Sequence, residues 1–115
     1  MALNDLAKRL RQFAEERDWN QFHSPKNLAI SISVEAAELL ELFQWSRGRD
    51  DWDCMQEEAI HDRTAEELAD ILLYLVRFAD KAGIDLERAA LRKLERNAAK
   101  YPAERFRGSD RKYDE

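Results

Sequence analysis

The sequence predicts an all-α protein whose protomer is a four-helix bundle. Only three glycines and two prolines occur in 115 residues, so few positions interrupt a long helix. Apolar side chains recur at helical spacing rather than in alternation, most clearly from Leu28 to Leu42. A chain of this length can bury one core, and we therefore expect a single domain over residues 1–115.

The first helix is expected from Asn4, which can cap it, to about Arg17. Its apolar positions recur at the spacing of one helix face and are Leu6, Leu10 and Phe13. The stretch that follows, ERDWNQFHSP, breaks this pattern and indicates a loop.

The second helix is expected from Pro25 to about Trp45. Ser24 followed by Pro25 is typical of a helix start. Apolar residues cover most of its circumference, which indicates burial on more than one side. So short a chain can hardly bury such a helix alone. We therefore expect an obligate homo-oligomer, in which a partner subunit covers the face formed by Ile30, Val34, Ala37 and Trp45.

Residues 46–63 are polar and weakly patterned, and we expect a connection there with one short helix around residues 54–60. The third helix should run from Thr64 to about Lys81. Gly83 follows in a position that favours a left-handed cap.

Asp85 is the expected cap of the fourth helix, which should reach about Lys100. Asn97 is a polar residue within the otherwise apolar stripe of this helix, and Lys93 lies beside that stripe. Beyond Pro102 the tail, residues 103–115, contains four basic residues, Arg105, Arg107, Arg111 and Lys112. This tail is either a solvated chain end or a segment that closes over an anionic ligand.

Two pairs of carboxylates interrupt the apolar runs. Glu35 and Glu38 lie in the second helix, and Glu67 and Asp70 lie in the third. Residues three apart point to the same side of a helix, and both pairs share their side with apolar residues. All four acids should therefore point inward. Buried carboxylates take up protons or destabilise a fold unless something balances their charge, and a divalent cation does so.

Oxygen ligands without histidine or cysteine favour Mg²⁺, with Mn²⁺ as a substitute, over zinc or copper. Neither pair has the histidine partner of the Glu-x-x-His pairs in di-iron bundles, which argues against oxygen activation. Four acids hold more charge than one Mg²⁺ needs, so we expect two or more ions. Such sites are typical of phosphoryl chemistry.

Two other interpretations of these acids stay open. Thr64-Ala65-Glu66-Glu67 matches a capping box, in which Glu67 would bond the amide of Thr64. The acids could also form only interhelical salt bridges in a non-catalytic oligomerisation module. Against the second interpretation, no Lys or Arg shares the stripe beside Glu35.

Aromatic residues near the acids supply surfaces on which a flat base could stack. They are Trp19 and Phe22 before the second helix, Trp45 at its end, and Tyr74 one turn beyond Asp70. His23 is either a contact to the base or an ordinary loop residue beside the helix cap.

Composition excludes several classes of function. The chain has 24 acidic and 19 basic residues and a net charge of −5, so we expect no binding to a nucleic acid polymer, which requires a basic surface. No apolar run approaches the length of a membrane span, and the first residues lack the apolar segment of a signal peptide. A single cysteine, Cys54, cannot form an intramolecular disulfide. We therefore expect a cytoplasmic protein.

The chain resembles the all-α nucleoside triphosphate pyrophosphohydrolases of the MazG-like superfamily in two segments, EAAELLELFQW and EELADILLYLVRFADKAGIDL. The mark of that family is an ExxE helix followed by an ExxD helix. Two further stretches are similar to its dCTP pyrophosphatase branch, ERDWNQFHSPKNLAISISVEAAELLELFQW and KYPAERFRGSDRKYDE. The likeness covers nearly the whole chain and is weak only over residues 46–63.

The resemblance implies hydrolysis of a nucleoside triphosphate between its α and β phosphates, which gives the monophosphate and pyrophosphate and clears the nucleotide pool. dCTP or a modified dCTP is the favoured substrate, while dUTP, dATP and damaged nucleotides stay open, because a few hydrogen bonds decide base choice. The resemblance also implies intertwined homodimers or homotetramers with active sites close to subunit contacts.

The resemblance further assigns roles to single residues. The four acids, Glu35, Glu38, Glu67 and Asp70, would be the catalytic magnesium ligands, and a water activated by the metal would attack the α phosphorus. The residues that match contacts to the nucleotide are Trp19, His23, Trp45, Tyr74 and Asn97 around the base and sugar, and Lys93 at the phosphates.

Overall fold

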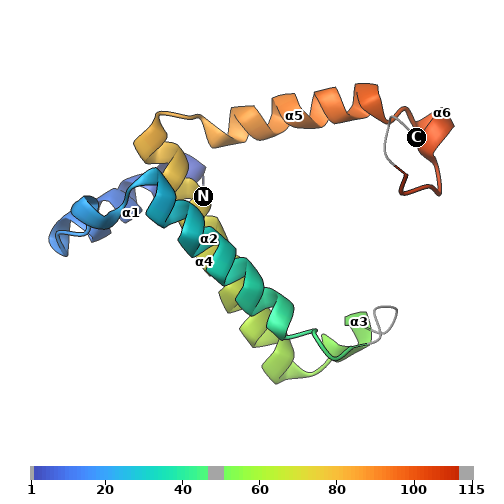
Figure 1. Cartoon of the computed structure of the whole chain (residues 1–115), viewed down its shortest axis with the longest axis horizontal. Helices are drawn as coiled ribbons and strands as arrows, with labels where there is room; N and C mark the ends of the chain where they lie inside the picture. The colour runs from blue at the N-terminus through green and yellow to red at the C-terminus, as the bar shows by residue number, and fades with distance from the viewer. Residues whose placement is uncertain (1, 47–50, 112–115) are drawn as a thin grey trace. The chain divides into compact units, whose positions relative to one another are not determined.

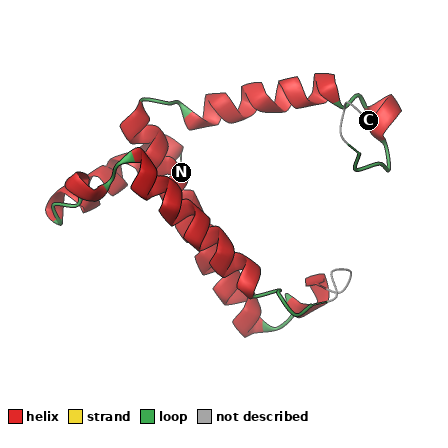
Figure 2. Cartoon of the chain, in the orientation of Figure 1, coloured by secondary structure: helices red, strands yellow, loops and turns green. Residues whose placement is uncertain are grey.

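A computed structural model describes residues 2–46 and 51–111 of the protein, and all regular structure within them is helical (Figure 1, Figure 2). The all-α class is therefore confirmed for the described residues. They divide into two compact units, residues 1–83 and residues 84–115, each of which is described by itself. The single domain, the closed bundle and the oligomer stay predictions.

The first unit contains α1 (Leu3–Glu16), the 3₁₀ turn η1 (Asn20–Phe22), α2 (Pro25–Glu41), α3 (Asp51–Cys54) and α4 (Glu58–Ala82). Both α1 and α2 pack against α4, and Figure 1 shows α2 running along it. The core of the unit consists of small and aliphatic side chains from these three helices, namely Ala7, Ala14, Leu28, Val76 and Ala79. The long contact between α2 and α4 brings the two acid-bearing helices together.

Several helix ends confirm the sequence prediction. Ser24 caps α2, because its Oγ accepts a hydrogen bond from the amide of Asn27 at 3.1 Å. Gly83 ends α4 with a left-handed backbone, at φ 70°. The Oδ1 of Asp85 accepts from the amide of Arg88 at 3.0 Å.

The start of α4 was predicted wrongly. The helix begins at Glu58, so Thr64 lies inside it and is buried. The Oγ1 of Thr64 donates to the carbonyl oxygen of Ile60 at 2.7 Å, a bond that threonine forms within helices. The capping box is therefore wrong, and Glu67 has no free helix-start amide to bond.

Other boundaries differ by less. Asn4 lies inside α1, because the carbonyl of Ala2 accepts the first helical bonds. The second helix ends at Glu41, and turns lead from there to Trp45. The short helix expected around residues 54–60 is replaced by α3 and the first turn of α4, while residues 47–50 of the connection lie outside the described part.

The face of α2 that was expected to meet a partner is open within one chain. Ile30 and Val34 are 50% and 49% exposed, and Ala37 is exposed as well. This exposure supports the predicted partner subunit without identifying it. No helix among the described residues is long and apolar enough to cross a membrane.

The second unit contains α5 (Leu86–Lys100) and α6 (Ala103–Phe106). The ring of Phe106 lies edge-on to Tyr101, with centroids 4.9 Å apart. The guanidinium groups of Arg105 and Arg111 lie 5.7 and 5.3 Å from the centroid of Phe106. The first part of the basic tail is therefore ordered around one aromatic ring, while Lys112 lies outside the described residues.

Candidate functional site

Three of the four predicted acids form a cluster between α2 and α4. Glu35 and Glu38 come from α2 and Glu67 from α4, and each offers a carboxylate oxygen within 4.8 Å of the other two. The cluster follows from the sequence and the packing together. The two acids on α2 lie one helical turn apart and so share a face, and α2 runs along α4.

Two oxygen atoms of this cluster are buried without a hydrogen-bond partner among the described residues, the Oε2 of Glu35 and the Oε2 of Glu67. Buried polar atoms are nearly always bonded, so such atoms indicate a missing ligand or a functional site. No ion pair in the described part of the chain joins any of the four acids to a lysine or arginine. Salt bridges among the described residues therefore do not balance these charges.

Burial, followed by the neighbouring carboxyl groups of Glu38, Glu67 and Asp70, raises the pKa of Glu35 to about 7. Burial also raises the pKa of Glu67, with Glu38 and Asp70 adding to the effect. The raised pKa of each residue indicates that its negative charge is buried near other carboxylates without a counter-charge. A divalent cation with oxygen ligands fits this donor set, because it would bond the two partnerless oxygens and offset the repulsion.

Asp70 is not among the three clustered acids. It lies one turn after Glu67 on α4, is exposed, and lines a pocket of about 550 Å³ in the first unit. We call this the aromatic pocket, after its ring-bearing lining residues Phe13, Trp19, Phe22, His23 and Tyr74. Asp70 thus connects the acid cluster with a concave, largely apolar surface of the kind that binds small ligands.

The structure places the predicted nucleotide contacts in different regions. Trp19, His23 and Tyr74 all line the aromatic pocket. The ring of Trp19 lies edge-on to those of Phe13 and His23, with centroids 5.6 and 6.3 Å away. Trp45 does not line it and is 89% exposed.

Lys93 and Asn97 lie on α5, one turn apart and therefore on one face, in the second unit. Their contacts to a nucleotide stay predictions, because the two units are described separately.

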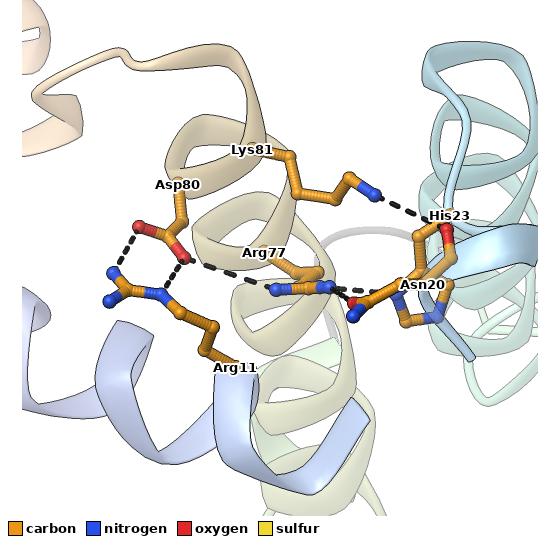
Figure 3. A network of polar contacts seen from close by, with 6 residues as sticks. All are labelled: Arg11, Asn20, His23, Arg77, Asp80 and Lys81. Atoms are coloured by element: carbon orange, nitrogen blue, oxygen red, sulfur yellow. Dashed lines mark hydrogen bonds and ion pairs between the residues drawn. The ribbon is translucent and has the colours of Figure 1, made fainter. Parts of the chain in front are cut away.

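Arg77 is a residue of the aromatic pocket that sequence reasoning missed. It is only 4% exposed, and it stands at the centre of the polar network in Figure 3. Its Nε donates to the Nδ1 of His23 at 3.1 Å, and its Nη2 donates to the Oδ1 of Asn20. Its Nη1 lies 3.9 Å from the Oδ2 of Asp80.

Asp80 also accepts two hydrogen bonds from Arg11. The Nε and Nη2 of Arg11 donate to the two carboxylate oxygens of Asp80 at 3.0 and 2.8 Å. The hydrogen bond from Arg11 lowers the pKa of Asp80, so this carboxylate is a firm counter-charge for Arg77. The signal available in the sequence was the lone cation in the apolar run ILLYLVRFA, because a buried arginine must have partners.

Comparison with known proteins identifies related chains. The model of the MazG-like family matches residues 30–115. Human dCTP pyrophosphatase 1 is 42% identical over 117 aligned residues, which cover 98% of this chain and 66% of that protein. Rat dCTP pyrophosphatase 1 is 41% identical over 96% of this chain and 65% of its own length. The chain thus spans just under two thirds of the curated relatives that it matches.

A solved structure also matches. It is the crystal structure of a pyrophosphatase from Archaeoglobus fulgidus, with a TM-score of 0.80 and 43% sequence identity. The match covers 86% of this chain and 91% of the archaeal chain.

Proposed function

The chain belongs to the MazG-like family, and we propose that it hydrolyses a deoxynucleoside triphosphate to the monophosphate and pyrophosphate. The favoured substrate is dCTP or a modified dCTP, because the similar proteins from human and rat are dCTP pyrophosphatases. The proposed role is to remove such nucleotides from the pool.

One observation supports this proposal above the others. Two buried carboxylate oxygens without partners come from two different helices, and Asp70, one turn along α4 from Glu67, lines a pocket with aromatic rings. Glu35, Glu38 and Glu67 would hold Mg²⁺, or Mn²⁺ in its place, and Asp70 would complete the set from the rim of the pocket. Bound Mg²⁺ supplies positive charge for the phosphate oxygens and lowers the pKa of a bound water.

The chain's own residues bind and orient the substrate. Trp19 and Tyr74 offer ring surfaces for the base, and the apolar lining excludes water around it. Lys93 is proposed to contact the phosphates, and Trp45 and Asn97 to lie around the base and sugar. The proposed assembly is a homodimer or homotetramer, in which the exposed face of α2 is covered.

The products of dCTP test this proposal. We expect incubation with Mg²⁺ to give dCMP and pyrophosphate, with no orthophosphate. A panel of nucleoside triphosphates, with separate detection of pyrophosphate and orthophosphate, measures both the bond cleaved and the base preferred. First products of dCDP and orthophosphate would contradict the proposal, and faster turnover of dUTP or dATP would replace the favoured substrate.

A matched variant ties the activity to the acid cluster. Glu38→Gln keeps the size of the side chain but loses the charged ligand. We therefore expect turnover to fall by more than about tenfold, or about 1.4 kcal/mol. The far-UV circular dichroism spectrum, which reports helix content, should not change. Wild-type turnover in this variant would remove Glu38 from the proposed ligands.

A further inference from the structure

We propose that Arg77 is a positioning residue, which fixes the proton of His23 on Nε2 and so presents His23 to the base as a hydrogen-bond donor. The identity of the ligand rests on the proposed function, whereas the state of the histidine does not. The group recognised would be a hydrogen-bond acceptor on the base, such as the unprotonated N3 of cytosine.

The first step of the argument is the direction of one hydrogen bond. The Nε of Arg77 lies 3.1 Å from the Nδ1 of His23, and an arginine nitrogen carries protons and only donates. Nδ1 must therefore be the acceptor, without a proton of its own. In a neutral imidazole the one proton then lies on Nε2.

The second step is that the neutral ring is favoured at this place. Burial lowers the pKa of His23, and the positive charges of Arg77 and Lys81 lower it further. A proton on Nδ1 would face the Nε–H of Arg77, donor against donor.

The third step is that Arg77 cannot easily turn away. Its guanidinium is buried and bonded to Asn20 on one side, with Asp80 on the other (Figure 3). Arg11 holds Asp80 in place, and Lys81 donates to the backbone oxygen of Asn20 at 3.3 Å. The network thus ties the loop that bears His23 to α4 through one rigid planar group.

The fourth step concerns what His23 can offer a ligand. His23 lines the aromatic pocket, and its Nε2 has no hydrogen-bond partner within the described ranges. Since Nδ1 is taken by Arg77, the polar atom left for a ligand is a donor. Cytosine has an acceptor at N3, whereas uracil and thymine have an N–H there. A fixed donor at this place therefore distinguishes the two classes of base, provided that the ring nitrogen is the atom contacted.

Nitrogen NMR of the full chain tests the tautomer without any assay of activity. The chain has two histidines, His23 and His61, so ¹⁵N-histidine labelling gives an internal reference on the exposed His61. We expect His23 of the unmodified protein to be protonated on Nε2 alone. Protonation of Nδ1 would overturn the proposal, even if no variant can be purified.

A pair of substitutions tests the cause. Arg77→Met removes the donor with an unbranched side chain, and we expect His23 to become a mixture of tautomers. Arg11→Met is the matched control, because it removes a guanidinium from the same network without touching His23. An unchanged single tautomer in a folded Arg77→Met protein would overturn the assignment.

A double-mutant cycle with dCTP separates positioning from folding. We expect Arg77→Met and His23→Ala each to raise KM about tenfold, the loss of about one hydrogen bond, with smaller changes in kcat. The double variant should bind no worse than His23→Ala alone, because Arg77 acts through His23. The melting temperature should instead fall on removal of Arg77 in both backgrounds.

Three outcomes decide the matter. KM effects that multiply in the double variant would make Arg77 independent of His23 and overturn the proposal. The analogue 3-deaza-dCTP lacks the N3 acceptor. The proposal is supported if the unmodified protein has a raised KM for this analogue and if Arg77→Met does not change that KM. If the unmodified protein hydrolyses no nucleotide, the proposed function fails, and the NMR result still decides the tautomer.

Discussion

At the scale of single residues, Glu35 is where burial and charge conflict most directly. Its Oε2 is buried without a partner, and three other acids raise the energy of its charged form. Such a residue is tolerated in a small fold when a proton or a cation relieves it. Relief by a proton is favoured at low pH and relief by a cation at high pH. The pH dependence of the free energy of unfolding therefore tests the site.

We predict that the metal-free protein becomes less stable as pH rises from about 5 to 8. An ordinary carboxyl pKa of 4.5 describes Glu35 in the unfolded chain, and burial together with the neighbouring acids raises it to about 7 in the fold. The folded state therefore holds the proton more tightly between these values. This tighter binding contributes its full stabilisation below the lower pKa, and the stabilisation is lost as pH rises through the upper pKa. Thermal denaturation across this range measures the effect.

Glu35→Gln is the matched control, because it keeps the shape and removes the titration. The lowered pKa of His23 acts in the opposite direction, so the informative quantity is the difference between the unmodified protein and this variant. Added Mg²⁺ should abolish the decline in the unmodified protein and should stabilise the variant less. Equal curves for the two proteins without metal would contradict the prediction.

At the scale of the element, α4 decides the geometry of the whole site. It supplies Glu67, Asp70, Tyr74 and Arg77, and it extends 25 residues from Glu58 to Ala82. The additional turns before Thr64 place Glu67 in the helix interior. There its carboxylate has no free amide to bond and is available to a cation.

The early start of α4 can be measured at Arg63, an exposed position in its second turn outside the acid cluster. We predict that Arg63→Gly is less stable than Arg63→Ala by about 1 kcal/mol, the difference expected within a helix. Urea unfolding of the two variants gives this difference, and the alanine variant accounts for the lost side chain. Equal stabilities would restore the helix start to Thr64.

At the scale of the whole molecule, large apolar side chains stay exposed on one chain. They include Leu40 on α2, Leu68 and Leu72 on α4, and Leu91 and Leu94 on α5. Exposed apolar surface on this scale marks interaction surfaces. It agrees with the proposed oligomer.

The basic tail offers a prediction at this scale. Deleting residues 108–115 leaves Phe106 and its contact with Tyr101 in place, so we expect the melting temperature to change little. The deletion removes Arg111 and Lys112, and charge-assisted contacts to a triphosphate are each worth about 1.5 to 3 kcal/mol. We therefore predict a rise in KM for dCTP of at least about tenfold. An unaltered KM would make the tail a solvated end, and loss of folding would make it structural.

Features that depend on neighbours a few residues away could be predicted from the amino-acid sequence. Apolar spacing predicted the four long helices, and the caps at Ser24, Gly83 and Asp85 were found from residue type alone. The two acid pairs followed from the helical repeat. These features are local, so a linear pattern contains them. The start of α4 was missed because polar residues with good helix propensity give no apolar period.

Which distant groups come together depends on how the helices pack. The closeness of Glu35 and Glu67 and the burial of one oxygen on each depend on how α2 lies along α4. The partnership of Arg77 with His23 joins residues 54 positions apart, and that of Arg11 with Asp80 joins residues 69 apart. No local pattern specifies such pairs, because they arise when packing removes water and leaves each buried charge to find its partner within the fold.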